Sequence, residues 1–214
     1  MVNSFRTSWL GCLLLLAGPL AAAPGEQVDT AARLEQLRVE RGLPINLDAD
    51  WSEFDRNRNR LLFRGLRITQ GELTIEADAA EAERLDFDDA NWTFRGHVVI
   101  VNDGTRLESD EAQARFSAHQ LVNAVLTGAP ASFRQRRPGK QSITRGRARR
   151  MEYVLGEHSI RLSGDAWVSD GANEVSGPRI AYEISRDLIT AESDDSGQVT
   201  MKIIPPEGDG GGSR

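Results

Sequence analysis

The stretch Leu61-Leu-Phe-Arg-Gly65 decides the fold, because close copies of it return along the chain. The copies are Trp92-Thr-Phe-Arg-Gly96 and Ile160-Arg-Leu-Ser-Gly164, with a weaker one at Val125-Leu-Thr-Gly128. Their glycines are 31, 32 and 36 residues apart. Self-similarity at such a period is typical of repeat architectures. Chance recurrence of glycine is the competing explanation, and the matching flanking residues argue against it.

A second motif lies between these copies. Ile45-Asn-Leu-Asp-Ala-Asp50 recurs as Leu73-Thr-Ile-Glu-Ala-Asp78 and more loosely as Thr105-Arg-Leu-Glu-Ser-Asp110. A repeated glycine inside a strand marks a kink, and an aspartate at a strand end can turn the chain. Each repeat is therefore expected to hold two or more short strands bent at the same place. Stacked together, they would form a folded sheet with a continuous crease.

Alternation of apolar and polar residues supports an all-β domain over residues 43–206. The alternation is clear in Ile180-Ala-Tyr-Glu-Ile184 and in Met151-Glu-Tyr153. A closed up-and-down barrel and a parallel β-helix are alternatives, but short, kinked strands and long repeats suit them less. An insertion from Arg134 to Lys140 is expected to form a loop.

The two ends of the chain have different compositions. Residues 1–23 are typical of a signal peptide, with Arg6, the apolar run Trp9–Leu20 and the small residues Ala21–Ala23. Cleavage after Ala23 or after Gly25 is consistent with the sequence. Residues 24–42 form a linker with a short helix expected at 29–42, and the Gly-rich tail at 207–214 is expected to be disordered.

Cysteine usage and net charge narrow the range of functions. Cys12 is the sole cysteine and would leave with the signal peptide, so the exported chain would contain no disulfide or Cys-ligated metal. The net charge of −6 argues against general nucleic-acid binding.

The order and spacing of several short motifs resemble the OstA-like family of periplasmic lipopolysaccharide-transport proteins. The motifs are Leu43–Asp50, Phe63-Arg-Gly65 with Gln70–Asp78, Gly146-Arg-Ala148 with Met151–Tyr153, Leu162–Ala166, Gly177 and Ile180–Tyr182. The resemblance implies a β-taco, or β-jellyroll, of two folded antiparallel sheets. It also implies a periplasmic carrier that holds the lipid A acyl chains of lipopolysaccharide in a hydrophobic crease.

Family members join end to end, so the resemblance implies LptC-like inner-membrane and LptD-like outer-membrane partners and head-to-tail homo-oligomers. The edge strands expected to mediate these contacts are 43–48 and 197–204. Neither carries the cluster of inward charges that would block edge pairing. A structural β-scaffold of the periplasm without a ligand is the alternative function.

Nine apolar residues are the candidates to line the crease, and packing as an ordinary core is the competing interpretation for each. They are Phe63, Phe94, Val98, Ile100, Phe116, Leu162, Val168, Tyr182 and Ile184.

We expect no enzymatic activity, cofactor or metal. The sequence contains no nucleophile elbow, zinc-protease motif or phosphate-binding glycine loop. The run Asp55–Asn59 begins like a calcium loop but lacks its glycine and its final glutamate. The basic segment Arg134–Arg150 is interpreted as a solvated surface in preference to a site for an anionic partner.

Overall fold

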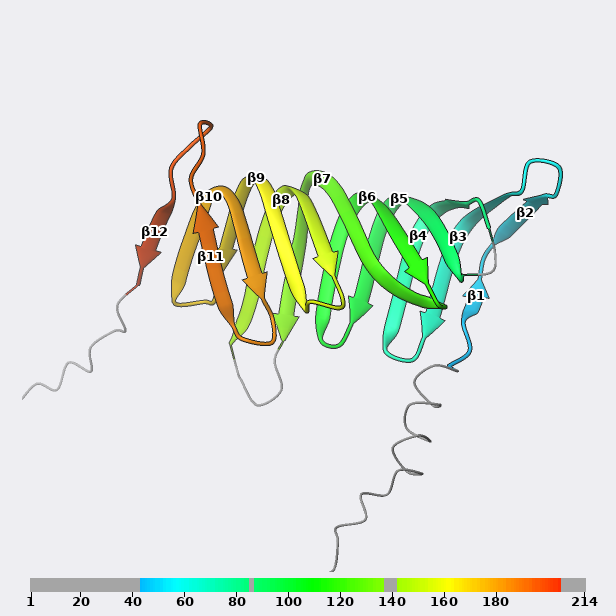
Figure 1. Cartoon of the computed structure of the whole chain (residues 1–214), viewed down its shortest axis with the longest axis horizontal. Coiled ribbons are helices and arrows are strands. Elements are labelled where there is room, and N and C mark those ends of the chain that lie inside the picture. The colour runs from blue at the N-terminus through cyan, green and yellow to red at the C-terminus, as the bar shows by residue number, and fades with distance from the viewer. Residues whose placement is uncertain (1–42, 85–86, 137–141, 205–214) are drawn as a thin grey trace, which may run out of the picture. The chain divides into compact units, whose positions relative to one another are not determined.

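The computed structural model describes residues 43–84, 87–136 and 142–204, and every regular element there is a β-strand (Figure 1). The predicted signal peptide, the helix at 29–42 and the tail at 207–214 lie outside these residues. None of the described residues forms an apolar helix of membrane-spanning length. The strands are β1 (Asn46–Asp48), β2 (Trp51–Asp55), β3 (Arg60–Gln70), β4 (Leu73–Ala82), β5 (Asp89–Asn102), β6 (Thr105–Ser117), β7 (Gln120–Arg136), β8 (Ile143–Val154), β9 (Ser159–Ser169), β10 (Asn173–Glu183), β11 (Leu188–Glu192) and β12 (Thr200–Ile203).

All twelve strands belong to one antiparallel sheet in which neighbours in sequence are neighbours in space. β1 and β2 share one register on β3, so together they form a single interrupted first strand. At the other end, β11 and β12 both pair with β10 and form an interrupted last strand. The predicted all-β, antiparallel architecture is confirmed.

A crease crosses the sheet, because the pairing register shifts at matching places in successive strand pairs. Shifts occur at Glu76/Ala79, Arg95/Val98, Glu108/Glu111, Thr127/Ala131, Arg147/Arg150 and Gly177/Arg179. The shifts divide the sheet into two halves. Half A contains segments 66–70, 73–77, 98–102, 105–109, 131–136, 143–148, 166–169 and 173–177. Half B contains segments 60–64, 79–82, 89–95, 111–117, 120–127, 150–154, 159–163 and 179–183.

The two repeated sequence motifs meet at this crease. The aspartate that ends one motif lies beside the glycine of the next, as in the Asp50–Gly65 and Asp78–Gly96 pairs. A Cβ added to Gly96 would lie 2.5 Å from Asp78 Oδ2, and the φ of Gly96 is +74°. Glycine is therefore required where the strand bends against the preceding aspartate.

The bends keep one side of the sheet apolar. In β3 the buried residues are Leu61 and Phe63 before Gly65, then Leu66 and Ile68 after it, so the inward-facing parity changes at the glycine. β4, β8 and β10 show the same change. Because the parity changes where the sheet folds, both halves turn their apolar side chains toward a shared core.

Three details of the sequence prediction are wrong. The strands are not short, since β3 to β10 each run across both halves and have 10 to 17 residues. β7 continues to Arg136, so the first part of the predicted Arg134–Lys140 loop is paired strand. The edge strands are shorter than 43–48 and 197–204, because β1 begins at Asn46 and β12 covers Thr200–Ile203. A bulge interrupts the ladder by a residue or two without ending it, which is why kinked strands remain long.

Candidate functional site: an apolar crease

The nine predicted crease residues all belong to, or pack against, one hydrophobic core. Eight are buried, from fully inaccessible for Phe94, Ile100, Val168 and Tyr182 to 8% exposed for Phe63. Ile184 is partly buried against the same core. The structure brings these side chains together on the inner face of the sheet, where the crease is filled by the protein's own residues. Contact between these residues and a lipid stays a prediction.

Aromatic rings dominate the core near the first strands. Trp92 stacks with Phe63 and Phe87, with ring centroids 5.6 and 4.9 Å away, and with Phe94 at 5.9 Å. Trp92 Nε1 is buried and has no acceptor among the described residues. An unpaired buried N–H group is costly, so this donor could bind an oxygen of a guest molecule.

An apolar pocket of about 410 Å³ opens at the first strands. Its walls come from β1, β2, the start of β3 and the residue Phe87, and Phe63 is the predicted crease residue that lines it. The remaining lining residues are Ile45, Leu47, Ser52, Glu53, Phe54 and Leu61. The volume falls in the usual range for small-molecule sites. This pocket gives the inner face of the sheet an opening at its N-terminal end.

Polar contacts join half A to half B, and we call them the seam. Gln70 Nε2 donates to the His119 carbonyl oxygen at 2.8 Å, and Asn102 Nδ2 donates to Tyr153 Oη at 3.1 Å. Tyr182 Oη lies 3.5 Å from Thr144 Oγ1. Burial raises the pKa of Tyr153, and its hydrogen bonds with Asn102 and Thr105 oppose the rise. The seam closes the crease with groups that can exchange partners with water.

An exposed ion pair marks the crease on the outer side. His97 Nδ1 lies 2.6 Å from Asp78 Oδ2, and both side chains are more than half exposed. The hydrogen bond from His97 to Asp78, reinforced by the carboxylate charge, raises the pKa of His97 above the usual value of 6.5.

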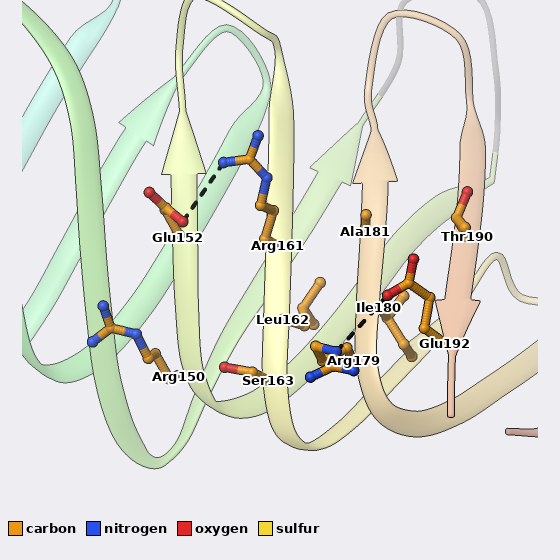
Figure 2. A pocket seen from close by; sticks show the side chains of 10 residues that line it. All are labelled: Arg150, Glu152, Arg161, Leu162, Ser163, Arg179, Ile180, Ala181, Thr190 and Glu192. Atoms are coloured by element: carbon orange, nitrogen blue, oxygen red, sulfur yellow. Dashed lines mark ion pairs between the residues drawn. The ribbon is translucent and has the colours of Figure 1, made fainter. Parts of the chain in front are cut away.

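A second hollow, of about 320 Å³, lies on the outer face of half B over β8 to β11 (Figure 2). The small residues Ser163 and Ala181 lie between larger charged ones. Two of its arginines are ion-paired, Arg161 with Glu152 at 3.7 Å and Arg179 with Glu192 at 3.8 Å. Half of the residues that line this hollow are charged, in contrast to the apolar pocket at the first strands.

Sequence reasoning missed several residues of the N-terminal pocket. Phe54 precedes a charged turn, and Phe87 lies between two strands, so alternation within a strand identified neither. Ile45 and Leu47 had been recognised only as part of a repeated motif. The structural signal for this site is Phe54, a large apolar side chain on the pocket wall that is 50% exposed.

Comparison with known proteins identifies the family to which this chain belongs. Residues 79–187, more than half of the chain, match the family described as "LptA/(LptD N-terminal domain) LPS transport protein". The chain belongs to this family. The matched segment of this LPS transport family member runs from half B of β4 through β10, so it contains most of the creased sheet.

Two lipopolysaccharide export system proteins are among the proteins similar to this chain. The lipopolysaccharide export system protein LptA of Escherichia coli K12 is 24% identical over 204 residues, which cover 95% of this chain and 90% of LptA. LptH of Pseudomonas aeruginosa, also a lipopolysaccharide export system protein, is 24% identical over 129 residues, covering 60% of this chain and 72% of LptH.

A solved structure supports the fold. The crystal structure of LptH, described as the LptA-homologous periplasmic component of the lipopolysaccharide transport device of P. aeruginosa, aligns with a TM-score of 0.52. The alignment covers 78% of this chain and 99% of LptH at 18% identity. The predicted OstA-like β-jellyroll fold is thereby confirmed.

Proposed function

We propose that this protein is a periplasmic carrier that binds the acyl chains of lipopolysaccharide along the inner face of its creased sheet. In this role it bridges the inner and outer membranes and catalyses no reaction. One observation carries the proposal: the inner face is apolar from β3 to β10 and opens into the apolar pocket beside β1 and β2. The names of the relatives support the same role, because they are export system proteins for lipopolysaccharide.

The energetics of acyl chains require such a shielded path. Each buried methylene is worth about 0.8 kcal/mol, so a twelve-carbon chain costs on the order of 10 kcal/mol to expose to water. A crease of similar composition along its length offers a nearly level path for sliding. Direction must then come from an energy source outside this chain.

The filled interior defines how a lipid would enter. Most of the predicted contact residues are almost inaccessible, so acyl chains must first occupy the N-terminal pocket or part the halves at the seam. Moving side chains out of a core packed at this density costs little free energy only if the guest molecule replaces the apolar contacts that those side chains lose.

A ligand-free scaffold is the second candidate function, and the same tight filling favours it. Native mass spectrometry of the purified protein separates the two. The carrier proposal predicts co-purified or added lipopolysaccharide bound at one or a few molecules per chain, whereas a scaffold would give the apoprotein mass at every lipid concentration.

The pocket wall provides a mutational test. Phe54→Asp places a carboxylate beside the proposed lipid path, so it should weaken photocrosslinking to labelled lipopolysaccharide about tenfold or more, because burying an unpaired charge is costly. Phe54 is half exposed, so the melting temperature should change little. Val122→Asp is the matched control, since Val122 is 39% exposed and does not line the pocket. Equal losses of crosslinking in both variants would exclude the pocket as the entry site.

Assembly through the sheet edges completes the proposal. Exposed large apolar residues gather at the first and last strands: Leu43, Trp51 and Phe54 at one end, and Val199, Met201, Ile203 and Ile204 at the other. We propose that the last strand of one copy pairs with the first strand of the next copy, or of an LptC-like or LptD-like neighbour. Such a heterologous contact does not close on itself, so it can extend in a line and continue the crease.

A further inference from the structure

Arginines face one another across three strands on the outer surface of half A. Arg106 on β6 is the register partner of Arg134 on β7, and Arg134 is the partner of Arg145 on β8. All three are exposed. With strands about 4.8 Å apart, the row is roughly 10 Å long. Arg147 lies two residues along β8 and covers the Trp167 ring, with its guanidinium 4.5 Å from the ring centroid.

Most of this row has no carboxylate partner among the described residues. Among the described residues, Arg106 is paired with Glu108 at 2.7 Å, but Arg134, Arg145 and Arg147 have no ion pair. Elsewhere the sheet places opposite charges in register, as in Arg67–Glu76 at 3.0 Å and Arg95–Glu111 at 3.5 Å. Like charges directly opposite one another destabilise a sheet, so the row costs folding energy that a bound anion would offset.

We propose that Arg134, Arg145 and Arg147, with Arg106 at their edge, form a docking face for the phosphate headgroups of an anionic lipid bilayer. This surface is on the outer side of the sheet, so the inference does not depend on lipid binding in the crease. Docking would hold the carrier beside a membrane while its inner face remained available.

The surroundings of the row favour a bilayer over other anions. An isolated exposed ion pair is worth about 0–1 kcal/mol, so a single small anion would bind these water-facing groups weakly. A bilayer presents many phosphates at once, and their surface potential acts on every arginine. A protein partner would need an apolar interface centre, whereas Ser132, Ser169 and Glu108 beside the row are polar. The aromatic neighbour in register, Trp167, is covered by Arg147. The net charge of −6 argues against a nucleic acid.

Sedimentation with vesicles tests the proposal. The parent should bind vesicles of mixed phosphatidylglycerol and phosphatidylcholine at low salt, release them at high salt, and ignore pure phosphatidylcholine. The double variant Arg134→Gln/Arg145→Gln should lose about 30-fold in affinity, at roughly 5-fold per arginine near an anionic surface. Its melting temperature should stay level or rise, because the like-charge contact is removed.

The control is Arg67→Gln/Arg115→Gln, which removes the same charge from arginines that are paired with Glu76 and Asp89. It should bind vesicles within about twofold of the parent, since these guanidinium charges are already balanced. Equal losses in both double variants would reduce the effect to net charge and overturn the proposal. So would absence of parent binding to phosphatidylglycerol vesicles at low salt.

Two further arms identify other anions. Arginine-dependent binding to phosphatidylcholine vesicles that carry lipopolysaccharide, without binding to phosphatidylglycerol, would reassign the face to the glycolipid headgroup. Arginine-dependent binding to a DNA duplex, but to no vesicle, would reassign it to nucleic acid. Each of these results overturns the bilayer proposal while leaving the carrier proposal intact.

Discussion

At the residue scale, the fold depends on glycines at the bends of the strands, where a side chain would not fit. Gly65, Gly96 and Gly164 have φ values of +59°, +74° and +75°, and the added Cβ of each would meet the side chain of the preceding strand. At Gly65 and Gly96 that side chain is an aspartate, and at Gly164 it is Arg149. Arg149 pairs with Asp165 at 3.1 Å, so the acid lies on the other strand there. The requirement for glycine is therefore steric, and the charge opposite it can vary.

Gly96→Ala tests this requirement. A left-handed φ and the contact with Asp78 should together lower the free energy of unfolding by about 1–3 kcal/mol, or the melting temperature by roughly 3–10 °C. Gly156→Ala is the control, because a Cβ there meets nothing within 4 Å. Thermal denaturation followed by circular dichroism measures both. Similar melting temperatures for the two variants would show that the crease glycine is replaceable.

The His97–Asp78 pair predicts a pH dependence at the same place. The pKa of His97 is raised in the folded chain, so the pair stabilises the fold fully below the unfolded value of about 6.5. That contribution disappears as the pH rises through the raised pKa. In Asp78→Asn, the His97 midpoint measured by NMR should fall toward 6.5. Identical midpoints in parent and variant would exclude the ion pair in solution.

At the scale of the element, each strand from β4 to β10 is two segments that meet at a bend, where the pairing register shifts. The sequence motifs located these bends, because glycine and aspartate are rare partners inside a strand. They did not show that pairing resumes beyond each bend, since register depends on the neighbouring strands. Alternation made Phe94 and Leu162 candidates for the crease, but it did not determine which face of each strand points inward. The row Arg106–Arg134–Arg145 was not predictable, because three bulged strands must be aligned before these residues meet. The pocket wall at Phe54 was hidden for a similar reason, since it forms only when β2 pairs with β3.

Strand β12 allows the assembly proposal to be tested by backbone chemistry. Ile204 N donates to the Ala172 carbonyl oxygen, so by antiparallel alternation Lys202 N–H faces β10 while Met201 N–H faces outward. Met201→Pro should remove an outward donor and reduce multimers, with little loss of stability.

Lys202→Pro should instead weaken the pairing of β12 with β10 and lower the melting temperature. Light scattering over a concentration series, together with thermal melts, distinguishes these effects. Multimers that persist in Met201→Pro at the parental concentration dependence would contradict edge pairing through β12.

At the scale of the whole sheet, closure depends on the seam. Half A and half B share a core, so acyl chains that enter away from the N-terminal pocket can replace core contacts only if the seam contacts separate for at least part of their length. In the proposed carrier, the apolar interior would hold the guest, and the polar seam is one of the two proposed entry routes.

Locking the seam should block loading. Gln70→Cys/His119→Cys, joined by a reducible bis-maleimide, ties together the positions whose side chain and carbonyl lie 2.8 Å apart. Crosslinked protein should take up less labelled lipopolysaccharide, and reduction should restore uptake. The control pair Gln70→Cys/Glu72→Cys, within one turn of half A, should load normally whether linked or not. Full loading of the locked seam would show that lipid enters only through the ends.

In each repeat, the glycine at the bend packs against one side chain of the preceding strand, and this arrangement affects how the length of the sheet can change. A hairpin of about 32 residues adds two strands, or roughly 10 Å, to the sheet without altering its cross-section. Duplication of such a unit leaves every existing bulge in place, because each bend is specified by its immediate neighbour. Duplication of one repeat would therefore lengthen the sheet in discrete steps of roughly 10 Å, so the distance that the protein spans can change by whole repeats.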